Sequence, residues 1–308
     1  NTSKKGALAT AADVRELLMR EDGSRRPVKL VCATLGVARS SFYRSKESGE
    51  KKGKRGPETE FSDEEVLGAI KEVLGETPFW GEGHRKVWAR LRKWKNIFVS
   101  QKRVLRIMRE NGLLAPFRKR HVHSDGKHDG TIIPKSVNEL WGADAARLWT
   151  EEDGCCWAFV CIDHYNLEPF VRVSKSGTKF EALDPVLKAV KERFGRVEKG
   201  VCRGLTLRHD HGSQYISKYF QSELRWLGIR SSPAYVGEPE GNGVAEWFIR
   251  TLKEQVIWPN RFKNVAQAAD AIEAFVQEFK KSWIIARLGY RTPLEVLQEL
   301  SCDQEVAD

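Results

Sequence analysis

The sequence predicts an α/β protein in which a mixed five-stranded sheet with flanking helices follows two small all-α helix-turn-helix units. Residues 138–260 alternate short apolar runs with segments of helical period, as expected when helices cover a sheet. Residues 1–113 show helical periodicity broken by Gly-containing turns. With 308 residues and 41% hydrophobic content, the chain is long enough for roughly two or three domains with real cores.

The net charge of +10 is unevenly distributed along the chain. Residues 1–137 contain 30 Lys and Arg against 17 Asp and Glu, whereas residues 138–308 contain 22 against 25. This asymmetry predicts a polyanion-binding part joined to a catalytic part, the alternative being a merely soluble basic protein. There is no apolar run of membrane-spanning length and no signal peptide, so we expect no membrane partner and a cytoplasmic location. Because the chain begins at Asn1 without a methionine, we expect a fragment or processed form.

The cysteines and histidines do not form the usual metal or disulfide patterns. The six cysteines include no C-x-x-C pair, which argues against a zinc or disulfide framework. His121, His123 and His128 could form half of a zinc site, but no cysteine pair follows at a suitable interval. We therefore expect these histidines to lie in a solvated linker.

The first helix-turn-helix unit is predicted at residues 1–48. Ala11–Glu21 has helical spacing, and Pro27 suits the first turn of a second helix. Val28–Arg44 then has the pattern of helix, Gly-containing turn and helix. A small helical hairpin with solvated charges is the alternative. The residues expected to face DNA are Arg39, Ser40, Ser41, Tyr43 and Arg44.

A second helical unit is predicted at residues 62–113, after a basic, Gly-rich linker at 49–61. Ser62 and Glu65 form a capping-box pattern that begins its first helix. Val87, Leu91 and Trp94 mark the next helix. Ser100 caps a third, Gln101–Asn111, which ends at Gly112. Its basic side is expected to contact DNA through Lys102, Arg103 and Arg106, unless it is only a solvated face.

After a linker at 114–137, the sheet-forming core is predicted at 138–260 and a C-terminal helical extension at 261–308. The extension holds the predicted helix Val265–Phe279 and a final capped helix near residues 289–297. Residues 233–241, rich in Gly and Pro, are predicted to form a mobile loop. In order, the core elements are a strand containing Asp144, strands Cys156–Asp163 and Pro169–Val173, helix Gly177–Phe194, strand Leu205–Leu207, helix Ser217–Leu227 and strand Ile229–Ser231.

Three carboxylates mark the candidate site. Asp144 lies inside an apolar strand, Asp210 follows a strand, and Glu246 lies in the first turns of a helix, with 35 residues between Asp210 and Glu246. Charge in an apolar run is costly unless it is paired or binds a metal. Three carboxylates brought together repel one another, so the arrangement favours divalent cations, and oxygen ligands favour Mg²⁺ or Mn²⁺.

These residues carry a family resemblance. The order Trp141-x-x-Asp144, then His209-Asp210-x-Gly-Ser-Gln-Tyr215, then Asn242-x-x-x-Glu246 resembles the Asp-Asp-Glu transposases and retroviral integrases, which share a ribonuclease-H-like core. The closest likeness is to the bacterial insertion-sequence transposases encoded in two overlapping frames, and the chain looks like the second-frame product. The match runs from about residue 15 to about residue 293. It departs from the family where Ala-Ala follows Asp144 and where Lys281 replaces an Asn.

The resemblance implies an enzyme that binds the terminal inverted repeats of its element and catalyses strand cleavage and strand transfer, through a circular intermediate. Asp144, Asp210 and Glu246 would be catalytic and would ligate two Mg²⁺ ions, for which Mn²⁺ can substitute. The implied partners are double-stranded DNA, at element ends and target, and further copies of the chain in a synaptic complex at the nucleoid. Alternatives are a ribonuclease H, a DNA-binding regulator, and a catalytically inactive domesticated transposase.

For the residues near the three carboxylates, the sequence allows more than one role. Asp163 ends a strand and is a rival metal ligand. His209 and His211 would donate to phosphate or the attacking water, or serve the turn, where Gly212 permits a tight bend.

The helix of Glu246 should have two faces. Arg250 and Lys253 share a stripe with Glu246 and are expected to face DNA, unless Arg250 pairs with Glu246 or Glu254. The apolar stripe expected to pack on the sheet is Val244, Phe248, Leu252 and Val256.

Overall fold

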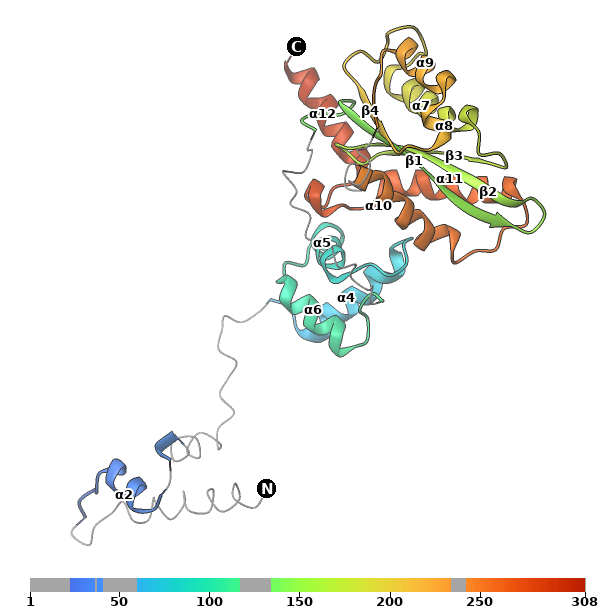
Figure 1. The fold of residues 1–308 in the computed structure, drawn as a ribbon. Coiled ribbons are helices and arrows are strands. Elements are labelled where there is room, and N and C mark those ends of the chain that lie inside the picture. Colours follow the sequence, from blue (N-terminus) through green and yellow to red (C-terminus); the bar gives the residue numbers. More distant parts are fainter. Residues whose placement is uncertain (1–22, 37, 41–59, 117–133, 234–241, 308) are drawn as a thin grey trace. The chain divides into compact units, whose positions relative to one another are not determined.

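The computed structural model describes residues 23–36, 38–40, 60–116, 134–233 and 242–307 (Figure 1). The chain divides into two units, residues 1–60 and 61–308. None of the described helices is long and apolar enough to cross a membrane.

In the first unit, helix α2 (Val28–Thr34) buries Val31 and Cys32. Pro27 precedes the helix as its N-cap, with ψ at 126°, whereas the sequence suggested a position in the first turn. Its ring fixes φ near −62°, which is compatible with either position. The predicted helix at 11–21 lies outside the described residues, as does most of the predicted recognition helix.

The second unit begins with a three-helix bundle of α4 (Asp63–Glu76), α5 (His84–Lys95) and α6 (Gln101–Glu110). The predicted capping box is confirmed: the Glu65 N–H donates to Ser62 Oγ at 3.2 Å, and the Ser62 N–H donates to Glu65 Oε2 at 2.7 Å. Ser100 caps α6 as predicted, accepting from the N–H of Arg103. The bundle encloses its own core of Val66, Ile70, Val73, Val87, Leu91, Val104, Ile107 and Met108.

A mixed five-stranded sheet follows, as predicted. Its strands are β1 (Leu140–Thr150), β2 (Gly154–Asp163), β3 (Pro169–Ser174), β4 (Thr206–His209) and β5 (Arg230–Pro233), in the order β3-β2-β1-β4-β5. The hairpin-linked pairs β1–β2 and β2–β3 are antiparallel, whereas β1–β4 and β4–β5 are parallel. The chain therefore returns to the centre of the sheet at β4, beside β1.

Helices cover both faces of the sheet (Figure 1). Helices α7 (Lys179–Phe194) and α9 (Lys218–Leu227) enclose one buried cluster with Trp141, Phe159 and Cys161. Helices α10 (Gly243–Leu252) and α11 (Val265–Ser282) enclose the other. Alternate residues of β2 enter each cluster, which explains its continuous apolar run.

The second cluster joins elements on both sides of residue 260. Phe248 and Leu252 of α10 are buried in it together with Ile272 and Phe279 of α11. Helix α11 therefore forms a layer of the core. The last helix, α12 (Pro293–Ala307), begins at a capping pair in which the Glu295 N–H donates to Thr292 Oγ1, as the sequence predicts.

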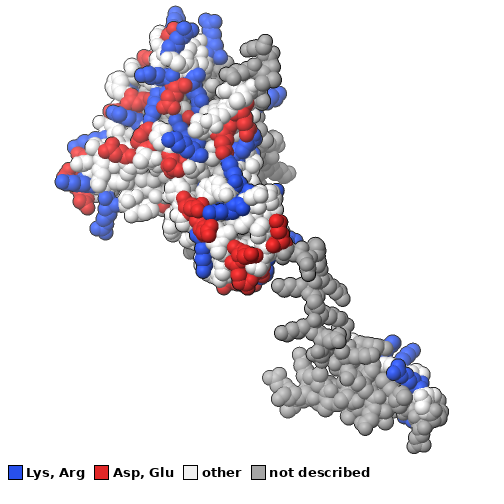
Figure 2. Space-filling view, turned by 180° about the vertical axis from the view of Figure 1, so that it is seen from behind, with Lys and Arg blue, Asp and Glu red and all other residues white. Residues whose placement is uncertain are grey.

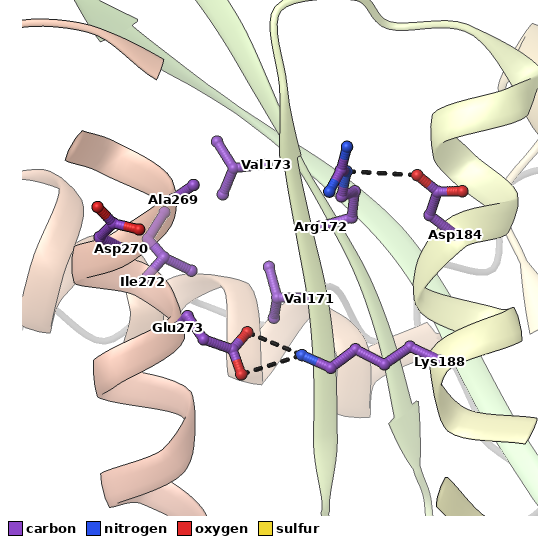
Figure 3. A pocket seen from close by; sticks show the side chains of 9 residues that line it. All are labelled: Val171, Arg172, Val173, Asp184, Lys188, Ala269, Asp270, Ile272 and Glu273. Carbon is purple, nitrogen blue, oxygen red and sulfur yellow. Dashed lines mark hydrogen bonds and ion pairs between the residues drawn. The ribbon is translucent and has the colours of Figure 1, made fainter. Parts of the chain in front are cut away.

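Edge strand β3 borders a cavity of about 330 Å³ between α7 and α11 (Figure 3). Lys188 of α7 contacts both carboxylate oxygens of Glu273 of α11, at 3.0 and 2.8 Å. Arg172 of β3 pairs with Asp184 of α7 at 3.3 Å. Charged groups across a sheet edge discourage pairing with a further strand, so we assign this cavity a structural role.

Candidate active site

Asp144 lies in the central strand β1, and Asp210 directly follows its neighbour β4. Asp144 lies within β1, opposite Val160 of β2. In the parallel pairing of β1 with β4, Ala143 is opposite His209, the last residue of β4. Asp210 follows immediately, so the sheet register brings the backbones of the two acidic residues side by side.

Glu246 comes to the same region on α10. It lies in the first turn of that helix, which packs against β1. Because side chains alternate along a strand, Asp144 shares a face with Ala146 and Leu148, which belong to the buried cluster on the α10 side. The face of β1 that carries Asp144 is therefore the face that α10 covers.

A hydrogen bond fixes the start of α10 to β1. Asn242, the N-cap residue, is buried and donates from Nδ2 to the Ala143 carbonyl oxygen at 2.9 Å. A Cβ at Gly142 would lie 2.7 Å from His164 Nε2 and 2.9 Å from Asn242 Oδ1, so only glycine permits this approach. Sequence reasoning placed Asn242 in the motif but did not identify its contact, and it missed Gly142.

The three carboxylates influence one another electrostatically. Burial raises the pKa of Asp144 to about 6, against the opposing effect of its hydrogen bond from the Ala145 N–H. The negative charges of Asp210 and Glu246 raise this pKa further, while Lys253 lowers it. Burial also raises the pKa of Glu246. A bound cation would relieve this repulsion.

The donor set fits a divalent metal that prefers oxygen. Carboxylate oxygens are the preferred ligands of Mg²⁺ and Mn²⁺. Within the described part of the chain, no three Asp, Glu, His or Cys side chains are drawn together closely enough to form a ready-made metal site. Asp210 and Glu246 are exposed, so their side chains can reorient toward a cation at modest cost.

The structure gives His209 a role in the fold. Its Nδ1 donates to the Asp210 carbonyl oxygen at 2.7 Å, and its Nε2 lies 2.9 Å from Ser231 Oγ on β5. The ring is buried and stacks on Tyr215. Of the two alternatives for this histidine, the geometry favours the turn residue, because both ring nitrogens are engaged.

Gly212 differs from its expected role. Its φ is −56°, which any residue can adopt, so a tight bend does not explain why a glycine stands at this position. Its N–H donates to Asp210 Oδ1 at 2.9 Å, and a Cβ would lie 2.6 Å from Gln214 Nε2. Gly212 therefore permits the chain to fold closely against Asp210.

Asp163, the rival metal ligand, is buried and organises the end of β2. Its Oδ2 accepts from the Asn138 N–H at 2.7 Å and from Trp141 Nε1 at 3.1 Å, and its Oδ1 accepts from the Tyr165 N–H at 2.6 Å. Both oxygens are committed to the protein, so the geometry gives Asp163 a structural role. The hydrogen bond to Asp163 also explains why the first motif contains Trp141.

The residues expected to contact DNA are not equally available. Lys102 is exposed on α6. Arg103 differs from the expectation, because it donates to Asp63 Oδ1 at 2.8 Å and to the Phe61 carbonyl oxygen at 2.7 Å, which holds α6 against α4. Arg106 also bonds Asp63. On the face of the second unit that Figure 2 shows, basic and acidic side chains are interspersed.

In the first unit, Arg39 and Ser40 are helical and exposed. The other expected contacts there, Ser41, Tyr43 and Arg44, lie outside the described residues.

The Glu246 helix keeps its predicted apolar stripe but changes form. Phe248, Leu252 and Val256 are buried, yet a π-helix (η2, Lys253–Ile257) replaces the expected continuous α-helix. Arg250 pairs with Glu254 at 3.0 Å, the alternative that the spacing left open. Lys253 acts electrostatically on Asp144.

The raised pKa of Asp144 makes stability depend on pH in the metal-free protein. Because the folded-state pKa exceeds the ordinary value of 3.8, the contribution to stability is present below about pH 4 and is lost as pH rises through about 6. Asp144→Asn should therefore raise the free energy of unfolding at pH 8 by about 3 kcal/mol. The gain should disappear near pH 4, which denaturant titration in chelator at the two pH values measures. An equal gain at both would contradict the assignment.

The chain is similar to known proteins in sequence and in structure. Residues 62–121 match the family model described as an HTH-like domain, which confirms the predicted second helix-turn-helix unit. Among solved structures, the magnesium-bound catalytic core domain of HTLV-2 integrase is similar at 18% identity and a TM-score of 0.40, covering 54% of this chain and 98% of that chain. The catalytic core domain of BIV integrase is similar at 17% identity and a TM-score of 0.40, covering 55% of this chain and 99% of that chain.

The strongest similarity is in sequence. The Escherichia coli transposase InsD for insertion element IS2A/D/F/H/I/K is 31% identical over 270 residues, which cover 82% of this chain and 83% of the relative. The predicted resemblance is thereby confirmed. Such identity across most of both chains shows that the chain belongs to the family of insertion-element transposases.

Proposed function

We propose that the chain is an active transposase that binds the terminal inverted repeats of an insertion element and catalyses metal-dependent strand cleavage and strand transfer. The observation that carries the proposal is the convergence of Asp144, Asp210 and Glu246 from β1, the end of β4 and α10, with the charges of the other two acting on Asp144. Family membership supports it. We expect the protein to act at the bacterial nucleoid.

The proposed chemistry is phosphoryl transfer on DNA. Divalent cations at the trio would supply Lewis-acid stabilisation of charge on the reacting phosphate oxygens. The protein's own part is positioning. The β1–β4 register sets Asp144 beside Asp210, and the Asn242 bond to the Ala143 carbonyl sets the start of the Glu246 helix. Lys253 adds a positive charge near the position of the phosphate. No covalent enzyme intermediate is required.

We propose that DNA is held by both helical units. Arg39, Ser40, Ser41, Tyr43 and Arg44 would contact it from the first unit and Lys102 from the second, and two units in series can read a longer site than one. Several copies of the chain would assemble with two element ends. The internal bonds of Arg103 argue against direct DNA contact by that residue, and those of Arg106 make it a weaker candidate.

A strand-cleavage assay tests the proposal. The purified chain with a duplex carrying the element end should nick the DNA at the end and join it to a target duplex when Mg²⁺ is supplied, with no product in chelator. Specific binding without cleavage would support the inactive domesticated alternative. Cleavage confined to an RNA–DNA hybrid would support a ribonuclease H.

Lys253→Ala should weaken end processing and flatten its salt dependence. The lysine acts on Asp144 electrostatically, and removing one phosphate-binding cation should reduce the slope of log K against log salt by about 0.9. The melting temperature should hardly change. Lys281→Ala, which removes an exposed lysine from the end of α11, is the matched control. A Lys253 variant that melts much earlier yet cleaves normally at low temperature would show that this lysine serves the fold.

A further inference from the structure

Two buried polar atoms border the same point above Gly142, beside the candidate active site. His164 and Asn242 are each 4% exposed, and among the described residues neither His164 Nε2 nor Asn242 Oδ1 has a hydrogen-bond partner. A Cβ at position 142 would lie 2.7 Å from the first atom and 2.9 Å from the second. Burial of a polar group without a partner costs the full desolvation of that group, so the two atoms need an explanation.

Three elements meet at this point. Gly142 lies in β1, two positions before Asp144 and on the same side of the strand. Asn242 is the N-cap residue of α10 and precedes Glu246 by one helical turn, about 6 Å along the axis. His164 directly follows β2. A bond between His164 and Asn242 would therefore join the end of β2 to the start of the helix that carries Glu246.

The backbone of His164 is fixed by two hydrogen bonds. Its N–H donates to the Leu140 carbonyl oxygen at 2.9 Å, and its own carbonyl oxygen accepts from Arg287 Nη2. Burial, with a smaller effect from the positive charges of Arg287 and Arg208, lowers the pKa of the imidazole to about 4. At neutral pH the ring is therefore uncharged, with one nitrogen that donates and one that accepts.

The orientation of Asn242 determines which tautomer of His164 fits. Asn242 Nδ2 donates to the Ala143 carbonyl oxygen at 2.9 Å. Because a carbonyl oxygen can only accept, the amide nitrogen must face Ala143, and the amide oxygen is left on the side of the imidazole. Asn242 Oδ1 therefore needs a donor, and His164 can supply one there only if Nε2 carries the proton.

We propose that His164 is a positioning residue of the active site, whose Nε2–H donates to Asn242 Oδ1. A small rotation of either side chain, or one bridging water molecule, completes this bond. The bond holds Asn242 in the orientation that reaches β1, and so fixes where Glu246 stands relative to Asp144. This inference rests on the proposed function, because it takes Glu246 to bind the divalent cation.

The first measurement identifies the tautomer of His164 without using activity. The full chain is labelled with ¹⁵N-histidine, and the signals of His164 are assigned by their loss in His164→Gln. A long-range ¹H–¹⁵N correlation spectrum at pH 7 should show Nε2 protonated and Nδ1 unprotonated. An unprotonated Nε2 would overturn the inference, because such a nitrogen cannot donate to Asn242 Oδ1.

The second measurement is the affinity of the DNA-free chain for Mn²⁺, by calorimetry. His164→Leu should weaken binding about 10-fold, as expected when an outer partner of a metal site is removed. His164→Gln should retain most of the affinity, because the Gln side chain can donate from nearly the same place. These two variants separate the hydrogen bond from the volume of the side chain.

Val173→Ala is the matched control for lost stability, since it removes buried apolar volume from the edge strand β3. Its melting temperature should fall while its affinity for Mn²⁺ stays unchanged. Equal weakening of Mn²⁺ binding in Val173→Ala, or full affinity in His164→Leu, would show that the histidine serves only the fold.

A double variant shows whether His164 acts through Asn242. In the Asn242→Ala background, His164→Leu should weaken Mn²⁺ binding no further, because the partner is already absent. Additive losses would mean that the two residues act separately, and would overturn the inference while leaving the proposed function in place. Absence of Mn²⁺ binding by the wild-type chain would contradict the metal site itself, and with it the proposed function.

Discussion

Asp210→Asn and Glu246→Gln are expected to lower the rate of strand cleavage on the order of 10³-fold or more, with DNA binding unchanged. The amides keep the shape of the side chains but remove the charge that attracts a divalent cation. Both residues are exposed, so the fold should tolerate the change. Nicking of an element-end duplex in Mg²⁺ measures the loss, and a binding titration in chelator measures retention.

Two further variants sharpen this result. Asp184→Asn removes a half-exposed carboxylate of α7 that pairs with Arg172, and its cleavage rate should be normal. Asp163→Asn should lower the melting temperature, because that carboxylate accepts several hydrogen bonds at the end of β2. Substantial nicking by Asp210→Asn, or an equal loss of cleavage rate in Asp184→Asn, would show that Asp144, Asp210 and Glu246 do not form the active site.

Local sequence signals were sufficient for most elements of this fold. Helix α4 begins at the capping box of Ser62 and Glu65, where the sequence pattern predicts it. The apolar run that ends at Asp163 forms strand β2, also as predicted. These features depend on neighbouring residues, because a cap bonds within one turn and a strand covered on both faces must be apolar throughout. The same reasoning placed Asp210 directly after a strand.

Features that depend on distant residues could not be predicted in this way. Arg103 was expected at DNA because it lies on a basic helix face, yet its partner, Asp63, is 40 positions away. The link from Asn242 to the Ala143 carbonyl spans 99 positions. Periodicity also assumes a regular helix, so it could not predict the π-helix that begins at Lys253, where the winding changes.

A buried ion pair contributes to the junction between the three-helix bundle and the core. Arg90 Nε and Nη2 donate to the two carboxylate oxygens of Glu82 at 2.6 and 2.8 Å, and Nη2 also donates to the Ser282 carbonyl oxygen of α11 at 3.0 Å. Both side chains are almost completely buried. Helix α5 is thereby joined to the last turn of α11.

Glu82→Gln should lower the free energy of unfolding by about 3–5 kcal/mol, because it leaves the Arg90 guanidinium buried without a counter-charge. For a unit of this size the melting temperature should fall by roughly 10 °C. Glu76→Gln, which weakens the exposed pair with Lys95, is the matched control and should change the melting temperature little.

A double variant separates the cost of an unpaired charge from the value of the pair itself. Glu82→Leu combined with Arg90→Met removes both charges, and buried pairs replaced by apolar residues often lose little stability. The double variant should therefore be more stable than Glu82→Gln alone, although the bond to the Ser282 carbonyl is removed as well. If it is less stable than the single variant, the pair contributes net stabilisation beyond balancing its own buried charge, and the junction depends on its hydrogen bonds.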